Sequence, residues 1–134
     1  MKIRSDNGTI LFANGAVSRD LTMRQFVASD LGQSAKETIV SPDRRHYEFD
    51  PEAGIGATIF FLGEGVDRIF IVMSMPSDAT REWTEELELR RKTIHNAWLE
   101  SELGKPPYDY EWGQVTSDYD ARSCSSEIIV VYER

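Results

Sequence analysis

The sequence predicts an α+β fold in two layers, an antiparallel β-sheet with two main helices on one face. The stretch from Lys36 to Met75 is strand-like and broken only by turn residues, and the C-terminal quarter is strand-like again. Two amphipathic segments each end in Leu-Gly ahead of a hairpin. Because strands outnumber helices, the helices are expected to share one face of the sheet. The length of 134 residues predicts a single domain, 1–134.

The N-terminal third contains a hairpin signal and then a helix signal. "KIRSDNGTILF" has two short extended runs around Asn7-Gly8, a dipeptide typical of tight hairpins, and the following "ANGAVSRD" is expected to be a loop. Thr22 with Gln25 fits a capping box, which predicts a helix over 22–31. Gly32 is expected to end that helix in a left-handed conformation.

The middle of the chain reads as two hairpins. "KETIV" and "RHYEF" flank the turn Ser41-Pro42-Asp43, and "GATIFFL" and "DRIFIVMSM" flank "GEGV". The apolar runs 59–62 and 69–73 are almost continuous. They are therefore expected to be central strands, covered on at least one face by helix.

A long helix is predicted between the cap residues Ser77 or Asp78 and a stop at Gly104. Two i,i+4 ion pairs are expected on it, Glu86–Arg90 and Glu88–Lys92. The residues expected to form its apolar face are Trp83, Leu87, Ile94, Ala97, Trp98 and Ser101.

The C-terminal region predicts a last hairpin, "DYEWGQVTSDY" followed by a turn and "EIIVVYE". If "YDYEWGQV" is one strand, alternation places two sets of side chains on opposite faces. One set is Tyr108, Tyr110, Trp112 and Gln114, and the other is Asp109, Glu111 and Gly113.

The two helix ends have similar sequences, which suggests a degenerate internal duplication. "FVASDLG" (26–32) matches "WLESELG" (98–104) in residue type at six of seven positions, and Tyr47 falls on Tyr119 at the same offset. Two amphipathic helices that end in Leu-Gly would also look alike without common descent, because both need the same stop.

Composition excludes several kinds of partner. The net charge of −8 and the pI near 4.7 make nucleic acid and anionic membranes poor partners, because the long-range field repels them. A basic protein partner is favoured by the same field. With a polar N-terminus and a single cysteine, Cys124, the chain is expected to be cytoplasmic.

The sequence offers no catalytic or metal-binding motif and implies no cofactor. The two histidines, His46 and His95, are far apart, and neither belongs to a pattern typical of zinc ligands. No nucleophile–base arrangement is visible, so the chain is expected not to be an enzyme. A pocket in which His46 and His95 face each other would overturn that expectation.

A motif spans the long helix and the strands after it: Glu88, Arg91, His95, Trp98, Leu99, Leu103, Gly104, Trp112, Gly113, Ser117, Tyr119 and Asp120. It resembles a signature of an uncharacterised family of bacterial single-domain proteins. The helix-and-hairpin units also loosely resemble those of beta-lactamase-inhibitor-like proteins. In size, acidity and lack of catalytic residues, the chain is similar to toxin-immunity proteins as a class. These resemblances imply a binding module.

The leading functional prediction is therefore a non-catalytic protein-binding module, an immunity- or inhibitor-type protein that neutralises a basic partner. The alternative is a structural or homo-oligomeric domain, with the aromatic residues in the core or in a homodimer interface; an enzyme comes third. The residues predicted to contact a partner are Tyr108, Asp109, Tyr110, Glu111, Trp112, Asp118 and Asp120.

Overall fold

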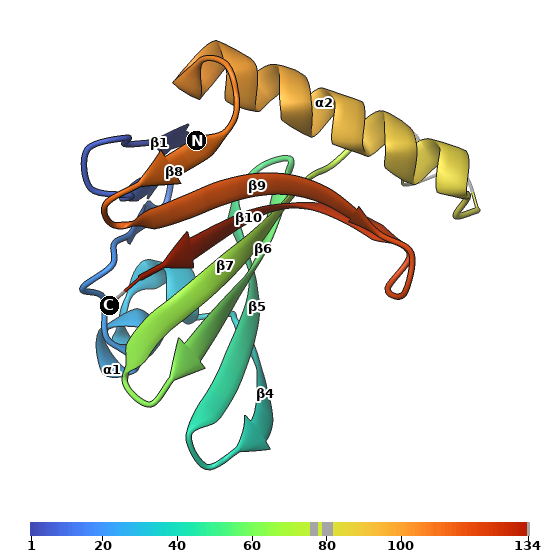
Figure 1. Cartoon of the computed structure of the whole chain (residues 1–134). Coiled ribbons are helices and arrows are strands. Elements are labelled where there is room, and N and C mark those ends of the chain that lie inside the picture. The colour runs from blue at the N-terminus through green and yellow to red at the C-terminus, as the bar shows by residue number, and fades with distance from the viewer. Residues whose placement is uncertain (76–77, 79–81, 134) are drawn as a thin grey trace.

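The computed structural model describes residues 1–75, 78 and 82–133, and it confirms the predicted α+β fold. Its main feature is one seven-stranded antiparallel sheet (Figure 1). The strands, in spatial order, are β4 (Lys36–Ser41), β5 (Arg44–Glu52), β6 (Ile55–Leu62), β7 (Gly65–Met73), β10 (Ser125–Tyr132), β9 (Gly113–Asp120) and β8 (Tyr108–Tyr110). The hairpins predicted over 36–75 and at the C-terminus are thereby confirmed.

A second sheet of three short strands lies at the N-terminus: β1 (Lys2–Ile3), β2 (Ile10–Phe12) and β3 (Gly15–Val17). The predicted hairpin is present, and its loop is closed by a bond from the Gly8 N–H to the Arg4 carbonyl at 2.8 Å. The prediction of a loop across "ANGAVSRD" was wrong at 15–17. Those residues pair with β2 through a turn at Ala13-Asn14.

The first helix, α1 (Met23–Ala28), starts as predicted and ends earlier. The capping box is confirmed, since Thr22 and Gln25 exchange bonds of 3.0 and 3.1 Å between side chain and backbone N–H. The segment η1 (Asp30–Gly32) then forms a 3₁₀ turn. Gly32 is not left-handed as predicted. A side chain there would collide with the carbonyl of Phe26, so this glycine serves close packing.

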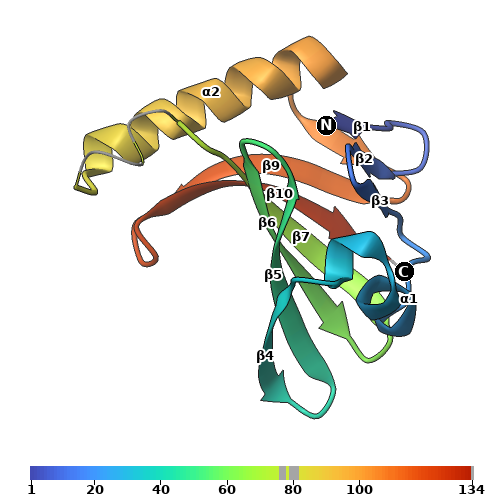
Figure 2. The ribbon, with the colours of Figure 1, turned by 180° about the vertical axis from the view of Figure 1, so that it is seen from behind.

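Both helices cover the same face of the large sheet. Phe26 of α1 packs on Tyr47, Phe49 and Phe61, with ring centroids 5.1–5.7 Å apart. Leu99 of the second helix belongs to the same buried core, and so do Ile3, Ile10, Phe12 and Val17 of the small sheet. Figure 2 shows the sheet from the α1 side, and Figure 1 shows the opposite side, on which none of the described helices lies. The two-layer prediction is confirmed.

The second helix, α2 (Glu85–Leu103), starts later than predicted. Thr84 is its N-cap, accepting a bond from the Leu87 N–H at 3.1 Å, and acidic residues fill its first turn. Asp78 is not a cap but accepts from the Met75 N–H at 2.7 Å. The alternative cap, Ser77, lies outside the described residues. Gly104 ends the helix at φ +83°, as predicted.

The predicted apolar face of α2 is confirmed at Leu87, which is buried, and in part at Trp98, which is half-buried against the core, but Ile94, Ala97 and Ser101 are exposed. The buried residues of α2 are Leu87, Glu88, Arg91, His95 and Leu99, whereas Trp83 and Ile94 are 52% and 43% exposed. The charged side chains turn inward because they meet polar groups at the ends of β7 and β10. For the same reason the Glu88–Lys92 pair was wrong, since Glu88 pairs with Arg91. The Glu86–Arg90 pair is confirmed at 3.1 Å.

The segment 108–115 is a hairpin and not the single strand that was predicted. β8 pairs with β9 so that Tyr110 faces Gly113, with Glu111 and Trp112 in the turn. The turn resets the alternation, so Gln114 is exposed and Gly113 is buried. Gly113 has φ +149°, and a side chain there would collide with the carbonyl of Val131.

Replacing Gly113 with alanine should therefore destabilise the fold by more than about 3 kcal/mol, since it adds backbone strain and a collision with the backbone of β10. Gly54 gives a matched control, because its φ is +80° and no atom lies within 4 Å of the place that a β-carbon would take. Gly54→Ala should cost only about 1 kcal/mol. Urea denaturation measures both, and equal losses would contradict this account of the hairpin.

The internal duplication stays a prediction. The two matched segments differ in backbone conformation, because 26–32 ends a short helix and enters a 3₁₀ turn whereas 98–104 closes a long helix. Gly32 and Gly104 correspondingly serve different purposes, close packing in the first case and a helix stop at positive φ in the second.

Candidate functional site

The seven predicted partner-contacting residues form two groups, one near each end of β9. Five of them, 108–112, form the β8–β9 hairpin at one end, and Asp118 and Asp120 lie at the other end. At about 3.3 Å per residue, the two groups are roughly 20 Å apart. They do not form one continuous surface.

The aromatic part of the hairpin mainly serves the core. Tyr108 and Trp112 are buried, and the Trp112 indole N–H donates to the carbonyl of Ser5 at 2.8 Å. Tyr110 is half-buried and stacks on Trp112 with ring centroids 5.0 Å apart. Two of the three rings therefore have almost no surface to offer a partner, and the outward residues of the hairpin are Asp109 and Glu111.

Asp118 and Asp120 belong to a group of carboxylates at the end of the β9–β10 hairpin. Asp118 pairs across the strands with Glu127, and both aspartates are exposed. Burial raises the pKa of Glu127, and the negative charges of Asp120, Glu88 and Asp118 raise it further, while its bond from the Ser125 hydroxyl lowers it. The neighbouring carboxylates therefore add to the main effect, which is the burial of Glu127.

The uncovered sheet face carries an aromatic row that sequence reasoning missed. His46, Phe60 and Phe70 lie side by side on β5, β6 and β7, with ring centroids 4.6 and 4.8 Å apart. All three are half-buried. The sequence signal for this row lies in "IFFL" and "RIFIV". Side chains of a strand alternate between the two faces, so every second residue of these runs points away from the face that the two predicted helices cover.

Two open hollows flank Phe70 on this face. The first, of about 470 Å³, is lined by Phe70, Val72 and Thr58 and by the charged side chains Lys36, Glu48, Asp50 and Glu127. The second, of about 450 Å³, is lined by Phe60, Phe70 and His46, by Val40 and Leu62, and by Arg44, Arg45, Arg68 and Asp67. The face is therefore apolar along its middle, acidic at one end and basic at the other.

Exposed apolar side chains also line the second hollow. Val40 is 59% exposed and Leu62 is 50% exposed, and both lie next to the aromatic row. Exposed apolar side chains grouped around half-buried aromatic rings, with charged groups at the rim, are typical of protein–protein interaction surfaces. We call the surface formed by these two hollows and the aromatic row the open face.

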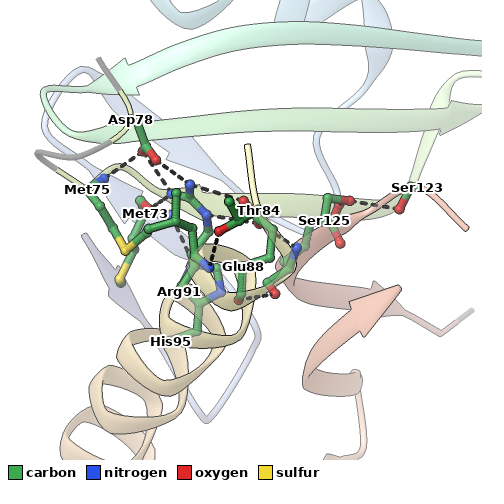
Figure 3. A network of polar contacts seen from close by, with 12 residues as sticks. Met73, Met75, Asp78, Thr84, Glu88, Arg91, His95, Ser123 and Ser125 are labelled. Atoms are coloured by element: carbon green, nitrogen blue, oxygen red, sulfur yellow. Dashed lines mark hydrogen bonds and ion pairs between the residues drawn. The ribbon is translucent and has the colours of Figure 1, made fainter. Parts of the chain in front are cut away.

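A buried network of charged and polar groups lies beneath α2, away from the open face (Figure 3). The Arg91 guanidinium donates to Asp78 at 2.6 and 3.0 Å, to Glu88 at 3.1 Å and to the Met73 carbonyl at 2.5 Å. Glu88 in turn accepts from the Ser126 N–H at 3.0 Å. The hydrogen bond between Asp78 and Arg91 holds the pKa of the Asp78 carboxyl below its ordinary value. The network ties α2 to the ends of β7 and β10.

His95 contacts Met73, the same residue that accepts from Arg91 in this network. Its Nε2 accepts from the Met73 N–H at 3.0 Å, which requires a neutral imidazole with its proton on Nδ1. Burial, reinforced by the charge of Arg91, lowers the pKa of His95 to about 4. His95 is fully buried on the helix side of the sheet, whereas His46 lies on the open face. The two histidines therefore do not meet.

The described residues contain no group of three or more His, Cys, Asp or Glu side chains able to hold a metal ion. Among the described helices, none is long and apolar enough to cross a membrane. No family model, curated protein or solved structure matches the chain. The resemblance to a bacterial single-domain family stays a prediction.

Proposed function

We propose that this chain is a non-catalytic protein-binding module of the immunity or inhibitor type, which neutralises a basic protein partner through its open face. The observation that carries the proposal is the aromatic row on an uncovered sheet face, next to a group of carboxylates. The row supplies apolar anchors, and the carboxylates attract a basic partner.

Charge complementarity identifies the kind of partner. Glu48, Asp50 and Glu127 line the acidic hollow, and Asp118 and Asp120 extend the same charge onto β9. The chain as a whole carries −8. A partner with a basic patch around an exposed apolar side chain therefore fits, with its apolar group over Phe70 and its cations against the carboxylates. Asp118 and Asp120 stay in the proposed surface, and Phe60 and Phe70 replace Tyr108 and Trp112 as the anchors.

Retention of a partner from native-host lysate tests this proposal with matched variants. Wild type should retain one basic protein at low salt and lose most of it at high salt, because added salt screens the charges. Phe70→Ser should lower retention of that protein at least tenfold, and the pair Asp118→Asn with Asp120→Asn should lower it several-fold. The pair Asp109→Asn with Glu111→Gln removes the same charge from the other hairpin and should leave retention unchanged.

Two results would contradict the proposal. One is retention that does not change with salt or with Phe70→Ser, provided that circular dichroism shows the variant folded. The other is loss of retention in the Asp109 and Glu111 control alone, which would place the interface on the β8–β9 hairpin.

A further inference from the structure

The open face has a property that binding of a basic partner does not require. It is acidic at one end and basic at the other, and the aromatic row lies between the two ends. Arg44 and Glu48 show this most simply, because both are exposed, lie on β5 and point to the open face four residues apart.

From this polarity we propose that a second copy of this chain packs face to face on the open face, as a two-fold dimer. A two-fold axis in the plane of the interface, perpendicular to β5 and passing over His46, reverses the strand direction of one copy relative to the other. The basic end of each copy then lies over the acidic end of the other. Arg44 of one copy lies over Glu48 of the other, and the same contact occurs twice.

The apolar middle of the face suits the same arrangement. The axis passes over the aromatic row, so Phe60 and Phe70 of one copy pack against the row of the other. Leu62 and Val40, which are half or more exposed in the single chain, lie next to the row and become covered at its margin. Sheets that pack face to face in this way form an apolar layer between them.

The net charge of −8 on each copy opposes association at long range but does not decide the contact. The Debye length is about 8 Å at physiological ionic strength, so distant charges are largely screened and the pairs within the interface dominate. The second copy uses the surface assigned above to a basic partner. If that assignment holds, dimer and partner complex exclude each other, although the dimer itself does not depend on it.

Charge reversal on β5 tests the dimer directly by analytical ultracentrifugation across the micromolar range. Wild type should show concentration-dependent dimers. Arg44→Glu should raise the dissociation constant of the dimer at least tenfold, because residues 44 and 48 of each copy are then both carboxylates and face those of the other copy. Glu48→Arg should raise it similarly, because arginines then face arginines. An equimolar mixture of the two variants should dimerise again, since only the mixed dimer pairs every opposite charge. The double variant should also dimerise.

Controls carry the same charge changes away from the open face, Lys105→Glu and Glu82→Arg, both at exposed positions. They should dimerise as wild type does. The proposal is overturned if wild type is monomeric throughout the range, if the single variants dimerise as well as the controls, or if the mixture stays monomeric. A monomeric wild type that still retains a basic protein through Phe70 would overturn the dimer alone, whereas a dimer without such retention would overturn the proposed function alone.

Discussion

Replacing Arg91 with alanine should destabilise the protein by about 3–5 kcal/mol, the largest effect expected for any side chain of α2. Among the described residues, Arg91 is the only counter-charge of the buried Glu88 carboxylate, and it also donates to the Met73 carbonyl. The change removes both interactions. Asp78 also loses its ion pair, but its side chain is 35% exposed and can be hydrated. Most of the loss should therefore come from Glu88.

Arg90 gives a control on the same helix. It pairs with Glu86 at the surface, where both side chains are more than 60% exposed, and Arg90→Ala should cost less than about 1 kcal/mol. Arg91→Lys keeps the charge and loses the planar fork, so it should fall between the two. Urea denaturation followed by circular dichroism gives the three values. Similar losses for Arg91→Ala and Arg90→Ala would show that the network does not hold α2 on the sheet.

The free energy of unfolding should fall as the pH drops from about 6.5 to about 4, because of His95. The pKa of His95 is about 4 in the folded protein and 6.5 in an unconstrained histidine, so the unfolded chain binds more protons across this window. The stabilisation from neutral His95 is fully present above pH 6.5 and is lost below pH 4. A difference of this size corresponds to on the order of 3 kcal/mol.

A comparison of variants isolates this histidine from the carboxylates, whose protonation also lowers stability in acid. His95→Gln should be less stable than wild type at neutral pH and should show a flatter dependence on pH between 6.5 and 4. His46→Gln makes the same substitution at the half-buried histidine of the open face and shows what the change of residue type alone does. Chemical denaturation at several pH values measures the slopes. Equal slopes in wild type and His95→Gln would contradict the buried, neutral imidazole.

The strand content was predictable because local signals agreed with the tertiary structure. The hairpin turns do fall within Ser41-Pro42-Asp43 and "GEGV", at 42–43 and 63–64, and the apolar runs 59–62 and 69–73 do lie in central strands. Thr22 and Gln25 likewise satisfy each other's backbone without help from elsewhere. Such features depend on neighbours in the sequence, and for that reason the sequence predicts them.

The orientation of α2 was not predictable in this way. Apolar periodicity favoured a face with Ile94 and Trp98, but the sheet presents polar groups where the helix lands, and Glu88 and Arg91 satisfy them. Those groups come from residues distant in sequence, so no local pattern reports them. The motif residues Glu88, Arg91 and His95 are spaced by three and four positions, which places them on one helical face, and that face is the buried one.

The candidate site in the structure differs from the predicted one for a related reason. Aromatic and acidic residues cluster in sequence at 108–112, but a tight turn buries Trp112 there. On the open face the same ingredients come from four strands, with Phe60 and Phe70 from two of them and Glu127 from a third. Only the strand order brings them together.

Hydroxyl-radical footprinting tests whether the open face makes the functional contact. The measurement compares side-chain oxidation of the chain alone, at a concentration where it is monomeric, with that of the complex with the retained basic protein. We predict that oxidation of Phe60 and Phe70 falls several-fold in the complex, while that of Trp83 beside α2 stays unchanged. Unchanged oxidation of Phe60 and Phe70, with protection of Tyr110 or Trp83 instead, would place the contact away from the open face.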